Sequence, residues 1–211
     1  MGRYHTRNHQ DTWYSTNYQR QCKLERTTCI APGCKTQTIL WPLCAHHATD
    51  LVGITVKQSP SPGRGCGLFA TRNIRSSSVL APYVGHTRSE EVANITHSPY
   101  LIPNPRNAKM VVDASCRRGY AAMSNHSPTP NCYLYITSID TKANGRGRWT
   151  EHADGWHVPR VLCHSTLTRG PMVWLITIRD VRMGEELCID YGPYAAEIND
   201  IRHSTLPALC R

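Results

Sequence analysis

The stretch SNHSPTPNCYLY, residues 124–135, decides how the rest of the chain is interpreted. It places Asn125 beside His126, follows them with two prolines, and then runs into Tyr-Leu-Tyr, which favours a β-strand. Two adjacent polar side chains at the mouth of a strand either cap a turn or hold a small ligand. This stretch alone leaves both interpretations open, so the other segments have to distinguish them.

The composition indicates a folded, basic protein. A chain of 211 residues with 40% hydrophobic and 18% charged residues can form one main domain and a small module beside it. The formal net charge of +9 favours an acidic partner such as nucleic acid, chromatin or an anionic cofactor, although such charge also serves solubility. No apolar run is long enough to span a membrane, and the first ten residues lack the apolar centre of a signal peptide. We therefore expect an intracellular protein.

Composition also divides the chain into four parts. Residues 1–21 are polar without an apolar period and predict a mobile arm, whereas residues 22–50 are dense in cysteine and predict a small module. The main domain is expected over residues 51–194. Residues 195–211 are expected to form a C-terminal arm.

Short β-like runs separated by Gly, Pro and Asn predict a mainly β main domain with short helices. These runs are residues 54–57, 79–84, 133–136, 172–178 and 186–189. Ser89 is a candidate cap for a brief helix over residues 89–95. Residues 138–170 are rich in Gly, Arg and His, and they predict a long insertion between two strands.

The module carries the pattern of a zinc site in CIAPGCKTQTILWPLCAHH, residues 29–47. Two cysteines flank a Pro-Gly turn, and a third cysteine stands two residues before a histidine pair, so that short loops can turn four ligands inward. The predicted ligands are Cys29, Cys34, Cys44 and His47. Three alternatives stay open: Cys22 in place of Cys34, His46 as a ligand, or unrelated buried cysteines with a surface histidine. The ten cysteines are interpreted as metal ligands or buried small hydrophobes rather than five disulfides.

Two further motifs are weak when taken singly. GRGCGLFATRNI, residues 63–74, has glycines that would let the backbone approach a ligand, but most glycine loops are simply turns. GEELCIDYG, residues 184–192, ends a predicted strand with Tyr191, and strand-end tyrosines are more often packed than catalytic.

Taken in order, however, four segments resemble a SET-domain protein methyltransferase. They are GRGCGLFATRNI, PYVGH at residues 82–86, VVDASCRRGYAAMSNHSPTPNC at residues 111–132, and VWLITIRDVRMGEELCIDYG at residues 173–192. The resemblance implies the SET fold, a β-clip with a knot-like crossing through which the C-terminal segment passes. It also implies a protein-lysine N-methyltransferase that uses S-adenosyl-L-methionine (SAM).

The resemblance assigns roles residue by residue. Gly65, Cys66, Gly67 and Leu68 would line the methionine end of SAM, and Asn125 and His126 would hold its adenosine and amino groups. Tyr191 matches the catalytic tyrosine of the family, and Tyr83 matches an aromatic residue that lines the lysine channel. The implied partner is a lysine-containing protein, with histones among the candidates, so a nuclear location is favoured over a cytoplasmic one.

The chain also departs from the family pattern. Ile189 stands where many relatives carry an aromatic residue that tunes the number of methyl groups, and Tyr133 or Tyr135 could supply that aromatic ring from another strand. Only Cys210 lies beyond Cys188, so the usual cysteine-rich segment after the domain is missing. Two rival hypotheses follow: a non-catalytic SET protein that binds partners, and a basic zinc protein that binds nucleic acid.

Overall fold

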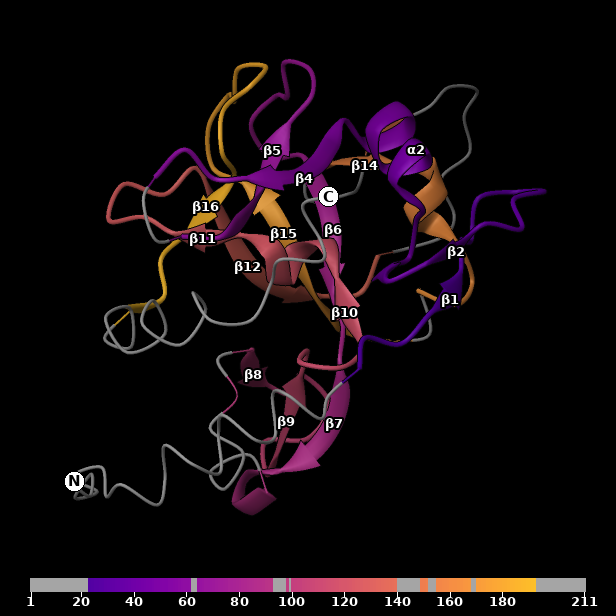
Figure 1. Cartoon of the computed structure of the whole chain (residues 1–211), viewed down its shortest axis with the longest axis vertical. Coiled ribbons are helices and arrows are strands. Elements are labelled where there is room, and N and C mark those ends of the chain that lie inside the picture. Colours follow the sequence, from indigo (N-terminus) through magenta and orange to yellow (C-terminus); the bar gives the residue numbers. More distant parts are fainter. Residues whose placement is uncertain are drawn as a thin grey trace.

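A computed structural model describes residues 23–61, 64–92, 98, 100–139, 149–151, 155–167 and 170–192 (Figure 1). The predicted arms at residues 1–21 and 195–211, and Cys22, lie outside the described residues. Within the described part, strands predominate and the helices are short, which confirms the mainly β prediction. No helix among these residues is long and apolar enough to cross a membrane.

The core is built around a three-stranded antiparallel sheet. Its order is β12 (Cys132–Thr137), β15 (Met172–Thr177) and β6 (Val79–Tyr83). The sequence of β15, MVWLIT, is a continuous apolar run, and Trp174, Leu175 and Ile176 are completely buried. A strand covered on both faces needs such a run instead of an alternating pattern. Three of the predicted β-runs thus form this sheet.

A hairpin of β4 (Ile54–Gln58) and β5 (Cys66–Ala70) packs beside this sheet. The register runs from Ile54 opposite Ala70 to Gln58 opposite Cys66, and every residue of β5 is buried. The Leu187 amide donates to the Leu68 carbonyl at 2.7 Å, which holds the C-terminal segment against β5. The hairpin therefore brings the glycine-rich stretch and the GEEL stretch together.

A second three-stranded sheet forms a separate lobe, seen at the bottom of Figure 1. Its order is β7 (His86–Ser89), β9 (Met110–Asp113) and β8 (Leu101–Pro103). These strands were not predicted, because the β7 sequence HTRS is polar and the other two strands are very short. Residues 90–92 are helical, in agreement with the start of the expected helix, and residues 93–95 lie outside the described residues.

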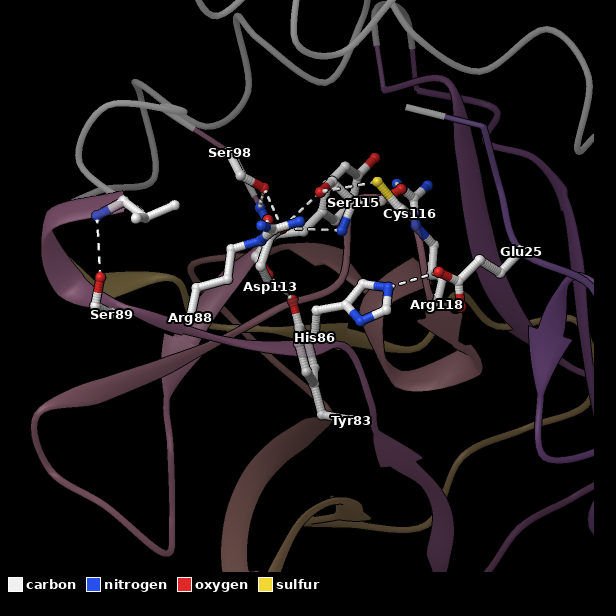
Figure 2. Close-up of polar contacts among 12 residues, drawn as sticks. Glu25, Tyr83, His86, Arg88, Ser89, Ser98, Asp113, Ser115, Cys116 and Arg118 are labelled. Carbon is white, nitrogen blue, oxygen red and sulfur yellow. Dashed lines mark hydrogen bonds and ion pairs between the residues drawn. The ribbon is translucent and has the colours of Figure 1, made fainter. Parts of the chain in front are cut away.

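The fully buried carboxylate of Asp113 organises the junction between this lobe and the core (Figure 2). It accepts hydrogen bonds from Ser98 Oγ at 2.8 Å, Ser115 Oγ at 2.7 Å and Arg88 Nε at 2.9 Å. A buried charge is tolerated when it is paired and hydrogen-bonded in this way. Ser98 Oγ in turn accepts from the Tyr100 amide at 3.2 Å, so Asp113 fixes the backbone around Tyr100.

The cysteine module is joined to the main domain by strand pairing. Within it, β1 (Thr27–Thr28) pairs with β2 (Gln37–Thr38), while β3 (Leu40–Trp41) pairs in parallel with β10 (Arg118–Gly119) of the main domain. Helix α2 (Ala45–His47) continues into the π-helical segment η1 (Ala48–Val52), which leads to β4. The predicted boundary between residues 50 and 51 falls inside this helical segment.

The remaining elements are short and lie, in the sequence, between β10 and β15. Short 3₁₀ helices span Tyr120–Met123 (η2) and Arg160–Cys163 (η3). The stretch predicted as an insertion carries β13 (Trp149–Glu151), which pairs with β14 (His157–Pro159). This hairpin lies between β12 and β15 in the sequence.

Candidate functional site

The stretch SNHSPTPNCYLY begins at a backbone crossing, at the left of the upper part of the molecule in Figure 1. β11 (Asn125–His126) pairs in parallel with β16 (Cys188–Ile189), and Figure 1 shows the two strands side by side. The Ser127 amide donates to the Ile189 carbonyl at 3.0 Å, and the Cys188 amide donates to Asn131 Oδ1 at 2.8 Å. Two segments far apart in the sequence are thereby held in fixed register.

Asn125 points from this crossing toward the glycine-rich strand β5. Its Nδ2 atom donates to Glu186 Oε1 at 2.6 Å and lies 3.3 Å from the Cys66 carbonyl oxygen. The residue is 5% exposed. The amide thus joins β11 to β5 and to Glu186, which precedes β16, and does not cap a turn.

Gly67 is required by this arrangement. A Cβ built on Gly67 would collide with Glu186 Oε1 and would lie 2.9 Å from Asn125 Nδ2. Gly65, just before β5, has a φ of 62°, a left-handed conformation that glycine adopts without strain. Of the two glycines predicted at the methionine end, Gly67 therefore lies where backbone and polar side chains come close together, whereas a Cβ on Gly65 would meet open space.

The other two residues of the predicted methionine end are not free side chains. Leu68 is completely buried in the hydrophobic core. Cys66 is disulfide-bonded, as is Cys116, so the prediction that the cysteines avoid disulfides is wrong for these two. The other described cysteines are free thiols. Cys66 and Leu68 can contribute to a ligand site chiefly through their backbone.

His126 connects the crossing to Tyr191. The Tyr191 amide donates to His126 Nδ1 at 3.2 Å, and the two rings lie 5.4 Å apart. Asp190 Oδ1 lies 3.6 Å from the same nitrogen. His126 Nδ1 thus contacts both the Tyr191 amide and, at a longer distance, the Asp190 carboxylate.

The Tyr191 hydroxyl is directed back to the chain segment that carries Asn125. It donates to the Ser124 carbonyl at 2.7 Å. Tyr191 lies two residues beyond the end of β16, so strand pairing and this hydrogen bond both restrict its position. The structure therefore gathers Gly67, Asn125, His126 and Tyr191 around one crossing.

Tyr83 belongs to the neighbouring cluster, at the end of β6 (Figure 2). Its hydroxyl donates to the Tyr100 carbonyl at 2.9 Å, and the residue is 5% exposed. The guanidinium of Arg118 lies over the Tyr100 ring at 3.8 Å. Tyr83 is thus held by the network that Asp113 organises, and its role in a lysine channel stays a prediction.

The four predicted zinc ligands form one cluster. The ligand atoms of Cys29, Cys34, Cys44 and His47 all lie within 4.8 Å of one another. His47 Nδ1 is 3.4 Å from Cys29 Sγ and 3.3 Å from Cys44 Sγ. Tetrahedral zinc with ordinary bond lengths places sulfur and nitrogen ligand atoms about 3.6 Å apart, so the cluster fits a Zn²⁺ ion.

Local structure explains why these four side chains meet. The Cys34 amide donates to the Ala31 carbonyl at 3.0 Å, closing a turn in which Gly33 has a φ of 74°. Cys44 is the N-cap of α2, and the helical turn carries His47 back over it. The turn and the helix supply two ligands each, as the spacing predicted.

Sequence reasoning missed Glu186. Its Oε2 atom accepts from Ser59 Oγ at 2.9 Å and its Oε1 atom from Asn125, so it links the end of β4 to the crossing. GEELCIDYG was recognised as a turn and strand before Tyr191, and nothing in that pattern showed that the second glutamate faces Asn125. Two cavities, of about 320 Å³ beside Trp149 and about 260 Å³ beside Trp41, are lined by other residues.

Comparison with known proteins identifies the fold family. The SET domain family matches residues 65–192, more than half of the chain, and the chain therefore belongs to this family. This match confirms the resemblance and the predicted SET fold.

The similar proteins are histone-lysine N-methyltransferases. An H3 lysine-4-specific enzyme of Aspergillus oryzae is 33% identical over 35% of this chain and 7% of its own length. The enzyme trr of Drosophila melanogaster is 34% identical over 36% of this chain and 3% of its own length. An H3 lysine-4-specific enzyme of Neurospora crassa is 25% identical over 74% of this chain and 10% of its own length. The chain thus spans only a small part of these relatives.

Among solved structures, a humanized mutant of the Chaetomium thermophilum Polycomb Repressive Complex 2, bound to the inhibitor GSK126, is similar. The sequence identity is 20% and the TM-score is 0.46, with 66% of this chain and 15% of that chain covered.

Proposed function

We propose that this protein is a SAM-dependent protein-lysine N-methyltransferase. The observation that carries the proposal is the crossing of β11 and β16, which brings Asn125, His126 and Tyr191 together beside Gly67. These are the positions that the SET resemblance assigns to donor binding and catalysis. The membership of the chain in the SET family supports the same activity.

The residues present fit SAM as the methyl donor. Close backbone approach at Gly67, the left-handed conformation and open space at Gly65, and the polar groups of Asn125 and His126 suit a ligand that carries an amino acid end and an adenosine. When bound, SAM would supply a methyl group on a sulfonium. The protein's part is to hold the ligand in one orientation and to exclude other orientations.

The acceptor side requires positioning and a neutral amine. A lysine side chain has an unperturbed pKa of about 10.4, so the site has to favour the deprotonated form before the amine can attack. In-line transfer also requires the reacting atoms to be aligned to within a fraction of an ångström. The Tyr191 hydroxyl, tethered to the Ser124 carbonyl, is the group we assign to this alignment.

We propose a histone as the protein substrate and the nucleus as the location. The similar proteins carry names that specify histone lysine, in several cases H3 lysine 4. The net charge of +9 is compatible with binding to chromatin, which is acidic. In this proposal the Cys/His cluster holds one structural zinc, and the module braces β10 through β3.

Asn125→Ala is expected to weaken the binding of S-adenosylhomocysteine, the product form of the donor, by at least about tenfold. The reason is that the amide is 5% exposed and lost hydrogen bonds at a buried site cost about 1–3 kcal/mol. Isothermal titration calorimetry on folded protein checks this. Asn107→Ala, in an exposed turn, is the control that should bind like wild type.

Two outcomes would contradict the proposal. Folded wild-type protein that fails to bind S-adenosylhomocysteine would favour the non-catalytic rival or the nucleic-acid rival. Unchanged binding by Asn125→Ala would remove Asn125 from the donor site.

A further inference from the structure

The Glu186 carboxylate contacts Asn125, one of the residues proposed to bind the methyl donor. It is half-buried and accepts two hydrogen bonds, one from Ser59 and one from Asn125. Among the residues that the structure describes, no Arg, Lys or His forms a salt bridge with it. Its polar contacts are therefore to a hydroxyl and an amide, and not to a neutralising cation.

These contacts determine which way the Asn125 amide is turned. The Glu186 carboxylate oxygen and the Cys66 carbonyl oxygen both only accept hydrogen bonds, so the Asn125 atom that faces them has to be Nδ2. The two hydrogens of Nδ2 are used by these two acceptors. Oδ1 is left as the free end of the amide, and no hydrogen bond to it is found within the described part of the chain.

A free amide oxygen beside the glycine-rich strand is suited to one kind of ligand group. It can only accept, so it selects a donor such as an ammonium group. SAM and S-adenosylhomocysteine both carry an α-ammonium at the methionine end. With the amide flipped, Nδ2 would face that ammonium, and two donors would oppose each other.

We infer that Glu186 is a positioning residue, which fixes the Asn125 amide so that Oδ1 accepts a hydrogen bond from the α-ammonium group of the methyl donor. This inference rests on the proposed function. Ser59 is part of the same device, because its hydroxyl holds the second carboxylate oxygen. Gly67 is part of it too, because a Cβ there would displace the carboxylate.

The test compares two ligands that differ only at the amino group: S-adenosylhomocysteine and its deaminated analogue, in which hydrogen replaces the amine. Glu186→Ala is expected to weaken S-adenosylhomocysteine binding about tenfold or more, because a hydrogen bond to a charged group is at stake. The same variant should change the affinity for the deaminated analogue less than about threefold, since that ligand never uses Oδ1. Calorimetry with both ligands measures the difference.

Three further variants keep the result interpretable. Glu186→Gln retains an oxygen that can accept from Asn125 and an amide that can donate to Ser59, so it should bind both ligands nearly as wild type does. Ser59→Ala should show the same ligand-selective loss, to a smaller extent, if Glu186→Ala fails to fold. Glu185→Ala is the matched control, because this neighbour instead accepts from Arg182 and Arg179.

Equal weakening of both ligands by Glu186→Ala, or by Ser59→Ala where that variant is used, would overturn the inference, since it would indicate a general structural effect. Unchanged binding of both ligands would overturn it as well. Either result leaves donor binding by wild type intact and so leaves the proposed function standing. Failure of wild type to bind S-adenosylhomocysteine would instead contradict the proposed function itself.

Discussion

Tyr191→Phe is expected to lower the rate of methyl transfer about a hundredfold while leaving donor binding and stability almost unchanged. The substitution removes one hydroxyl, which donates to the Ser124 carbonyl at 2.7 Å. The ring can keep its packing against His126. Because the hydroxyl is the group assigned to aligning the methyl and the amine, its loss should appear in kcat far more than in the affinity for the donor. Single-turnover kinetics with labelled SAM measures this.

Thr87→Val is the control, because it removes a hydroxyl from an exposed residue of β7, in the separate lobe away from the crossing. Equal transfer rates for Tyr191→Phe and wild type would show that Tyr191 is a packed strand-end residue. Loss of donor binding together with activity would show that the hydroxyl serves the fold instead.

Purified protein is expected to contain about one zinc ion per chain, and Cys44→Ser is expected to lose it and to unfold the module. The module has little core of its own, so the metal would supply much of its folding energy. Loss of the metal should also destabilise the crossing of β11 and β16, because β3 of the module pairs with β10, and η2 connects β10 to β11. Metal analysis and denaturant unfolding, with and without a chelator, test this.

His46→Ala is the control for the zinc prediction, since His46 is exposed, neighbours His47 and is not part of the cluster. Retention of zinc by Cys44→Ser, or loss of zinc in His46→Ala, would show that the ligand set is wrong. The zinc prediction would be contradicted if the purified protein contained no metal and a chelator did not change its stability.

The central part of the fold could be predicted because its sequence signals are local. The buried strands β6 and β15 are apolar runs bounded by turn residues, and the zinc ligands sit on a Pro-Gly turn and a short Cys-x-x-His spacing. Such patterns reflect the period of a strand or the reach of a loop. Such patterns can therefore be recognised in the sequence without knowledge of the rest of the molecule.

The contacts that complete the site could not be predicted in this way. Glu186 meets Asn125 and Ser59 only because a parallel crossing and a hairpin bring three distant segments together. Asp113 is a charged residue at the end of a short strand, and only the fold shows that it is fully buried and anchors Tyr100. Ser115 is a near neighbour of Asp113, but Ser98 and Arg88 lie 15 and 25 residues away in the sequence, and the partners of Glu186 are farther still. Neither residue type signals these distant partners.

The measurement that tests the account most directly is transfer of labelled methyl from SAM to protein, with histones as substrates and the modified residue located by mass spectrometry. We expect label on a lysine side chain of a histone, inhibition by S-adenosylhomocysteine, and a signal near background for Tyr191→Phe. Wild-type protein that binds S-adenosylhomocysteine and retains its zinc, yet transfers no methyl group to any histone or to proteins of a cell extract, would contradict the proposed activity.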